Sequence, residues 1–383
     1  MKLQHRSLTV AAVMAVAVCA PQARALVSLE DGRDHLFIDG SIELGYDSNV
    51  FANAQSGGSM LVEGTLGTEF ARRAGWIGVN ATASLTFARY ANFREQDYVD
   101  PKLTAEFTKQ TGRTTGSLIL SVQRENRADV DVNTRDVSWN YDAALNFQYP
   151  VIERYSISGS FDYDYVDYQN RQLFTNLATY TGNLYLYYIL NEQRDFFLDY
   201  RDRYSDLANG SHDVDSSLSA GVNGRVYGPF NGSLQGGYQV RTATGADGGS
   251  FSDFTASGSV TWNMNRRMTL TGDLSRDFST TATAQSIDST SLGLIFKDSF
   301  TAKSSVTLEG AAGQSRFLGP EGLVAPGGAR RVDNFVSLNT SYFYTINEHL
   351  KVSINYVYFR NWSTLAYAEF PRHQVNLTLV THW

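Results

Sequence analysis

Residues that could perform chemistry are few and scattered in this chain. His212 and Asp213 are adjacent in a polar stretch, and a histidine beside a carboxylate can act in general acid–base catalysis. An adjacent pair alone lacks the further groups that hydrolysis needs, so we interpret both as solvated residues of a surface loop. The only cysteine is Cys19, close to the N-terminus. We expect no catalytic residues and predict that the protein is not an enzyme.

A metal site is conceivable at Asp129-x-Asp131-x-Asn133, which resembles the start of a calcium-binding loop. Thr134 stands where such a loop requires glycine, and Asn140 stands where it requires glutamate. The motif is therefore incomplete. A hydrated acidic loop explains it, with a loosely bound Ca²⁺ as the alternative, and we predict neither a metal site nor a cofactor.

The clearest pattern in the chain is an alternation between positions 137 and 149. The odd positions are apolar or aromatic and the even ones are mostly polar; the odd positions are Val137, Trp139, Tyr141, Ala143, Leu145, Phe147 and Tyr149. A period of two predicts a β-strand with one apolar and one polar face. Aromatic residues at both ends of the apolar face are typical of the girdles of transmembrane barrels.

Comparable segments recur along the whole chain. We count about 18, with 16 possible, centred near residues 42, 66, 82, 105, 120, 143, 160, 184, 199, 221, 237, 259, 271, 293, 309, 340, 355 and 378. Tight turns between them alternate with longer polar stretches, which we assign to loops at 48–59, 124–136, 205–215, 242–252, 276–286 and 317–332. This arrangement predicts an all-β protein, a transmembrane antiparallel up-and-down β-barrel. A soluble β-sandwich or β-helix is the alternative.

The N-terminus has the three parts of a secretory signal peptide. Lys2 and Arg6 precede the apolar run Leu8–Ala20, and Ala23-Arg24-Ala25 follows. The run is shorter than the roughly 20 residues that a membrane-spanning helix needs. We predict a signal peptide at 1–25, a short periplasmic segment at 26–34 and a barrel at 35–383, in the outer membrane of a Gram-negative bacterium.

The polar faces of the predicted strands would line the lumen. Removal of residues 1–25 leaves 29 basic and 39 acidic residues, so nucleic acid is not an expected partner. The candidates for lumen-lining residues are Asp142, Asp162, Asp164, Asp199, Arg201, Arg203, Tyr185 and Tyr187. An acidic excess would favour cations or neutral solutes, and tyrosines in a polar wall suit sugar rings. The alternative is a polar lining whose charges largely pair with one another.

A family resemblance rests on the segment Gly45-Tyr46-Asp47-Ser48-Asn49-Val50-Phe51 and on the turns Asn191-Glu192 and Asn347-Glu348. With these motifs the chain resembles the putative β-barrel porin 2 family, whose members are often encoded in exopolysaccharide loci. The final Trp383 departs from the phenylalanine that commonly ends such barrels.

The resemblance implies a barrel that exports a polysaccharide through the outer membrane. Its partners would be outer-membrane lipid, a periplasmic polysaccharide-export protein and the polysaccharide itself. The family supplies no catalytic motif to carry over. A general diffusion porin for small solutes is the alternative function.

Overall fold

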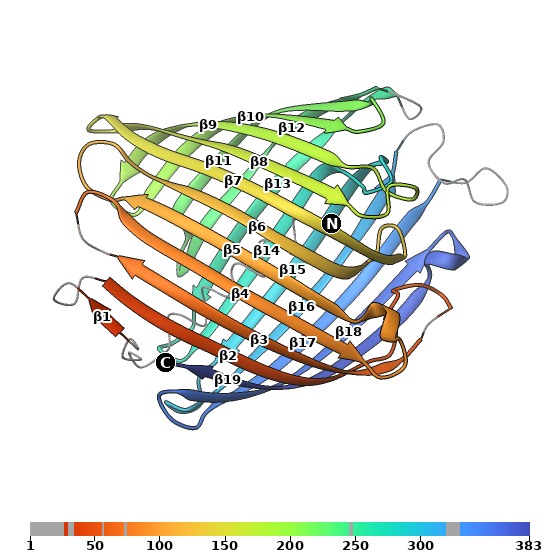
Figure 1. The fold of residues 1–383 in the computed structure, drawn as a ribbon. Helices are drawn as coiled ribbons and strands as arrows, with labels where there is room; N and C mark the ends of the chain where they lie inside the picture. The colour runs from red at the N-terminus through yellow and green to blue at the C-terminus, as the bar shows by residue number, and fades with distance from the viewer. Residues whose placement is uncertain (1–26, 30–33, 56, 73–74, 245–247, 319–329) are drawn as a thin grey trace.

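The protein is an antiparallel β-barrel. The computed structural model describes residues 27–29, 34–55, 57–72, 75–244, 248–318 and 330–383. Strands β2 to β19 pair in chain order, and β19 pairs with β2, so the predicted barrel of 18 strands is confirmed (Figure 1). Among the described residues, no helix is long and apolar enough to cross a membrane.

The strands are mostly 12 to 16 residues long. They are β2 (Asp34–Asp47), β3 (Ser59–Arg72), β4 (Gly78–Tyr90), β5 (Tyr98–Lys109), β6 (Thr115–Asp129), β7 (Thr134–Ile152), β8 (Tyr155–Tyr168), β9 (Leu177–Asn191), β10 (Arg194–Leu207), β11 (His212–Tyr227), β12 (Phe230–Ala243), β13 (Gly249–Asn263), β14 (Met268–Thr280), β15 (Ser286–Asp298), β16 (Ser304–Phe317), β17 (Val332–Thr345), β18 (Leu350–Ser363) and β19 (Phe370–His382). We call the end at which β2 begins the turn end, and the opposite end the loop end.

The N-terminal part of the chain is described only at a short strand, β1 (Val27–Leu29), which pairs with β2. The predicted signal peptide at 1–25 lies outside the described residues, as does most of the predicted segment 26–34. Both stay predictions.

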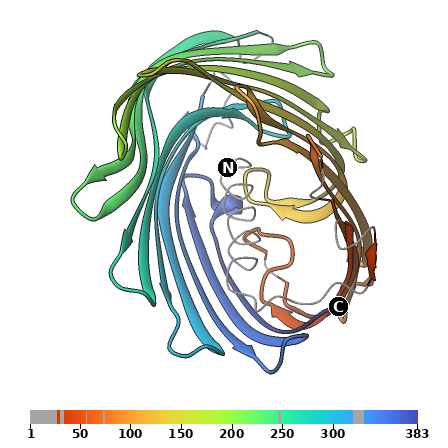
Figure 2. The same cartoon turned by 90° about the vertical axis from the view of Figure 1, so that its left-hand side faces the viewer.

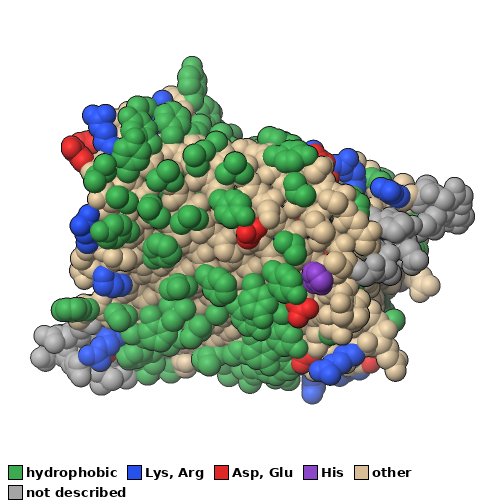
Figure 3. Space-filling model, turned by 90° about the horizontal axis from the view of Figure 1, so that it is seen from above, with side chains coloured by type: hydrophobic (Ala, Val, Ile, Leu, Met, Phe, Trp, Pro, Cys, Tyr) green, Lys and Arg blue, Asp and Glu red, His purple; other side chains and the backbone are tan. Residues whose placement is uncertain are grey.

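The outward face of the barrel is apolar. Leu145 on β7 is 48% exposed and lies in register with Leu118 on β6 and Phe161 on β8. Figure 3 shows hydrophobic side chains spread over one face, with Lys and Arg gathered near the two ends. Rings of Tyr163 and Tyr180 lie 5.0 Å apart in this outer surface. Large apolar side chains that point away from the protein suit a barrel surrounded by lipid.

Four of the six predicted loops consist mostly of strand residues, so the predicted lengths of these loops are wrong. The turn between β6 and β7 spans only 130–133, and β10 continues to Leu207 before β11 begins at His212. The β12–β13 and β14–β15 connections are shortened in the same way. Several charged residues that suggested loops are ion-paired on the strands, such as Arg127 with Glu125 and Arg241 with Asp215. This pairing lets polar sequences continue the sheet.

Near the loop end, strands β13 and β14 stop pairing and separate. These strands pair over Ala256–Asn263 and Thr269–Arg276. Beyond that, residues 250–255 stay paired with β12 and residues 277–280 stay paired with β15. Figure 2 shows the teal end of β14 and β15 inside the arc of the green strands β10 to β12. Near the loop end the barrel wall is therefore two layers thick on this side.

Candidate functional site: a bridged mouth and an acidic wall

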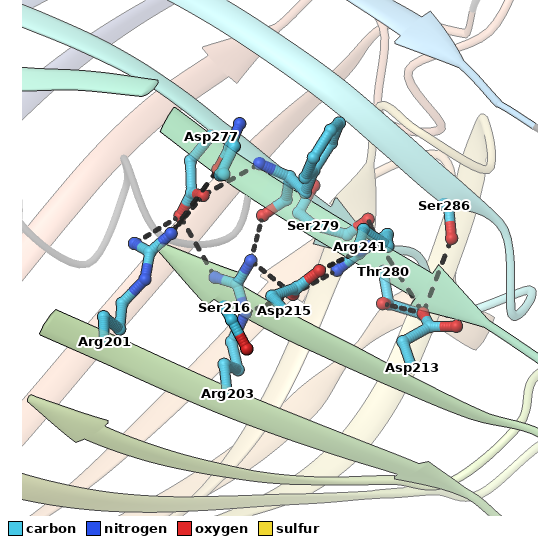
Figure 4. A network of polar contacts seen from close by, with 12 residues as sticks. Arg201, Arg203, Asp213, Asp215, Ser216, Arg241, Asp277, Ser279, Thr280 and Ser286 are labelled. Carbon is cyan, nitrogen blue, oxygen red and sulfur yellow. Dashed lines mark hydrogen bonds and ion pairs between the residues drawn. The ribbon is translucent and has the colours of Figure 1, made fainter. Parts of the chain in front are cut away.

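A buried set of ion pairs lies between the two layers. We call Arg201, Arg203, Asp215, Arg241 and Asp277 the seam network (Figure 4). Asp215, fully buried, accepts hydrogen bonds from Arg203 Nε at 2.7 Å and from Arg241 Nε at 2.5 Å. Asp277 accepts from Arg201 Nη2 at 2.7 Å and from Arg203 Nη1 at 3.1 Å. Three arginines thus share two carboxylates in a largely buried site.

The same arginines also bind backbone of β14. Arg203 Nη2 donates to the Phe278 carbonyl at 2.6 Å, and Arg241 Nη1 donates to the Ser279 carbonyl at 2.6 Å. Buried backbone carbonyls need hydrogen-bond donors, and β13 does not pair with this part of β14. The seam network therefore holds the wall together where backbone pairing between β13 and β14 ends.

A second set of contacts crosses the barrel at the loop end. Arg331, just before β17, is fully buried and donates from Nη1 to the Asp131 carbonyl at 2.6 Å. Its Nη2 donates to Asn133 Oδ1 at 3.1 Å, and its guanidinium lies 4.1 Å from the Phe317 ring centroid. Asp131 and Asn133 belong to the β6–β7 turn. Arg331 thus connects two distant parts of the wall.

The loop between β2 and β3 completes this crossing. Asn133 Nδ2 donates to the Ala52 carbonyl at 3.1 Å, and the Ala54 amide donates to the Tyr367 carbonyl at 3.1 Å. We call Arg331 and the segments 48–55, 130–133 and 364–369 the mouth bridge. Figure 2 shows these segments, coloured orange, yellow and dark blue, inside the ring of strands. The mouth bridge narrows the opening at the loop end.

The inward wall further from the mouth carries carboxylates with neutral partners. Glu43 accepts from Thr378 at 2.8 Å, Glu63 from Tyr98 at 2.6 Å, and Glu309 from Asn339 at 3.1 Å. We call the carboxylates with such partners the acidic belt: Glu43, Glu63, Glu69, Glu106, Asp162, Asp199 and Glu309. In the described part of the chain none of these seven is ion-paired with Lys or Arg. Most arginine–aspartate pairs of the described residues lie instead near the loop end.

The candidate lining residues fall into three groups. Arg201 and Arg203 belong to the seam network and hold structure. Asp142 and Asp164 lie opposite each other in register, and Asp142 accepts a hydrogen bond from Ser121 at 3.0 Å. The remaining four, Asp162, Asp199, Tyr185 and Tyr187, lie on β8, β9 and β10, on the face opposite the exposed leucines. That solutes touch these side chains stays a prediction.

Sequence reasoning missed several residues that organise the site. Asp215, Asp277 and Arg331 fell in predicted loops, so their charges suggested solvent rather than pairing. A usable signal existed on β14, because Phe278 returns to the apolar phase of Leu270 and Leu274 past the assumed strand end.

The His212–Asp213 pair is split by the fold. Consecutive residues of a strand point to opposite faces. The ring of His212 lies 5.8 Å from the ring of Tyr204, and Asp213 accepts a hydrogen bond from Thr280 on the inner layer at 2.7 Å. The two side chains cannot act on one substrate. The Asp129–Asn133 turn likewise serves the mouth bridge, since Asn133 contacts Ala52 and Arg331.

Comparison with known sequences gives one family. The family described as Putative beta-barrel porin 2 matches residues 37–382, nearly all of the barrel. A search of curated proteins gave no match.

Several solved structures have a similar overall fold. Pseudomonas aeruginosa OpdK with vanillate is 12% identical with a TM-score of 0.49, and covers 91% of this chain and 99% of its own. Pseudomonas aeruginosa OccK11 (OpdR) is 13% identical with a TM-score of 0.46, and the match covers 95% of this chain and 99% of OccK11. Acinetobacter baumannii OccAB3 is 10% identical with a TM-score of 0.45, covering 91% and 99%. Likenesses at this level carry no information about the solute.

Proposed function

Because the chain belongs to the putative beta-barrel porin 2 family and is an outer-membrane barrel of a Gram-negative bacterium, we propose that it is a diffusion pore for small solutes that favours cations. The family description, a porin, supports a pore. The distribution of charge along the inward wall supports the preference for cations.

The acidic belt is the observation that carries the proposal. Its seven carboxylates accept hydrogen bonds from hydroxyl and amide groups, which leave their negative charge uncompensated. Arg203 and Arg241, by contrast, are neutralised by Asp215 and Asp277 between the two wall layers. A passing ion would therefore meet seven carboxylates that no Lys or Arg of the described residues neutralises. Rings of carboxylates in a pore attract cations and repel anions.

The mouth bridge supports small solutes over a polymer. Arg331, Asn133 and the loop 48–55 meet across the loop end through hydrogen bonds. Ions and small molecules could pass beside these contacts while they stay formed. A polysaccharide chain would have to break these hydrogen bonds and keep them broken for as long as it passes through the mouth. The export function implied by the sequence resemblance therefore has less support from the geometry than diffusion has.

Conductance and ion selectivity test this proposal. The purified full-length barrel in a planar bilayer should conduct steadily, and a KCl gradient should give a reversal potential of the sign that K⁺ preference produces. The variant Glu43→Gln/Glu63→Gln/Glu309→Gln should move this potential toward zero, because it removes three belt charges. The control Asp253→Asn/Glu348→Gln/Glu192→Gln removes three carboxylates outside the belt and the mouth bridge, and should leave the potential unchanged. Equal shifts in both variants, or preference for Cl⁻, would overturn the proposal.

Export of polysaccharide makes different forecasts. It predicts that deletion of the gene abolishes surface polymer and leaves small-solute uptake intact, and that the purified barrel stays mostly closed. The diffusion pore predicts normal surface polymer and slower uptake of small cations in the deletion strain. Loss of polymer together with a closed barrel would favour export with a periplasmic partner.

A further inference from the structure

We propose that Tyr185, Tyr187, Phe197 and Asp199 form a binding site for organic cations that carry an apolar group. This inference deepens the proposed pore and rests on it, because it names the class of solute that the wall would hold. We call these four residues the aromatic–acid site. They lie on the adjacent strands β9 and β10, where Tyr187 is in register with Phe197 and Tyr185 with Asp199.

The three rings make one continuous surface. The ring centroids of Tyr187 and Phe197 are 5.4 Å apart, and Tyr185 lies 6.0 Å from each of the other two rings. Leu184 and Leu186 flank Tyr185 in sequence and are exposed on the outward face, so the rings lie on the inward face. In a wall otherwise rich in Ser, Asn and Asp, this surface can hold an apolar group.

Gly221 on β11 makes room for the central ring. A Cβ atom there would lie 2.4 Å from Phe197 Cζ and 2.5 Å from the Leu234 carbonyl oxygen. The Phe197 ring therefore packs over Gly221 and is only 5% exposed, while both tyrosines remain more accessible. The packing fixes the ring surface in place. A preformed aromatic surface loses little entropy when a ligand binds.

Asp199 lacks the cation that its burial calls for. It is 3% exposed, and Oδ2 accepts one long hydrogen bond from Gln235 Nε2 at 3.3 Å. Oδ1 is buried and has no hydrogen-bond partner among the described residues. The nearest guanidinium along β10, that of Arg201, is held by both oxygens of Asp277 at 2.7 and 3.0 Å. A buried carboxylate oxygen without a donor is unfavourable, and a ligand ammonium group would supply one.

The combination of rings and carboxylate selects the ligand class. Aromatic faces attract cations through their quadrupole, and tyrosine is among the better rings for this. A carboxylate beside the rings adds direct charge attraction and repels anions. A neutral sugar could stack on the same tyrosines but would leave Asp199 without a countercharge. The site therefore fits an ammonium joined to an aromatic or aliphatic group.

Block of the K⁺ current measures binding at this site. The probes are phenethylammonium, its neutral analogue 2-phenylethanol, and maltose, each titrated against the full-length barrel in a planar bilayer. Phenethylammonium should reduce the current saturably, and the two neutral probes should do so far less. Asp199→Asn should weaken the block at least tenfold, and Tyr185→Leu should weaken it several-fold. Glu309→Gln removes one belt charge away from the rings and should change the affinity less than twofold.

The outcomes separate this site from the pore itself. Equal effects of Asp199→Asn and Glu309→Gln would overturn the site while leaving a cation-selective pore. Block by maltose as strong as block by phenethylammonium would also overturn it. If the wild-type barrel does not conduct, the diffusion pore fails, and calorimetric titration of phenethylammonium into the detergent-solubilised barrel still tests the site. If Asp199→Asn loses this binding heat while its heat modifiability on gels shows that the barrel is still folded, the result would support the site. Absence of binding to the wild type would reject it.

Discussion

Arg203 on β10 and Asp277 on β14 are four strands apart in the sheet, yet Arg203 Nη1 donates to Asp277 Oδ2 at 3.1 Å. This contact exists because the loop-end part of β14 leaves β13 and lies against the inside of β10 to β12. Side chains then replace backbone hydrogen bonds as the connection across the wall. Buried ion pairs of this kind are sensitive to the loss of one partner, because the other charge stays buried.

Asp215 is the residue whose loss should disturb this connection most. Asp215→Asn leaves the guanidinium groups of Arg203 and Arg241 with one carboxylate fewer, and should destabilise the barrel by about 3–5 kcal/mol. The measurement is the temperature at which the folded band disappears on heat-modifiability gels. Asp253→Asn is the control, since Asp253 is 34% exposed and pairs at the surface. A similar loss of stability in both variants would contradict the role of the seam network.

Arg331 should control the width of the mouth. Arg331→Gln removes the hydrogen bonds to the β6–β7 turn, and the single-channel conductance should rise by a factor on the order of two as the mouth bridge loosens. Arg330 is adjacent and exposed, so Arg330→Gln removes the same charge without breaking the bridge. Unchanged conductance in Arg331→Gln would show that the bridge does not limit flow.

The register of β7 gives a prediction about the lipid-facing surface. Leu145 is exposed in the middle of the outward face, so Leu145→Arg should cost about 2–4 kcal/mol of folding free energy. Asn146→Arg should be much milder, because the next residue points to the aqueous interior. Unfolding in urea with both variants refolded into the same vesicles measures the difference. Equal costs would mean that the assigned faces are wrong.

Gly221 gives a prediction about the aromatic–acid site. Gly221→Ala forces Phe197 away from the wall and should cost about 1–3 kcal/mol, the usual range for overpacking. It should also weaken the block by phenethylammonium, since the ring surface moves. Gly310→Ala is the matched control, because a Cβ there meets no atom within 4 Å. If both variants behave like the wild type, Phe197 does not depend on Gly221 for its position.

Much of the fold can be predicted from short-range patterns in the sequence. Alternation such as that from Val137 to Tyr149 determines which residues face lipid, because side chains of a strand point to opposite faces with a period of two. Each of the 18 predicted strand centres lies within an observed strand. The polarity of residues such as Asp199 and Tyr185 also marked the inward wall. The strand ends were predicted less well, because charged residues suggest a loop as long as their ion-pair partners on other strands are unknown.

The partners themselves were decided by the tertiary structure. Arg203 finds Asp277 74 residues away, and Arg331 finds Asn133 198 residues away. No local sequence pattern predicts contacts between residues so far apart in the chain, since the strands that separate the two partners could curve in more than one way. The sequence by itself predicted a membrane barrel of about 18 strands, with 16 possible, and an acidic lining. The early end of β13–β14 pairing, the buried arginines and the bridged mouth arise only when the sheet closes, because closure brings together groups that must then satisfy one another's charges and hydrogen bonds.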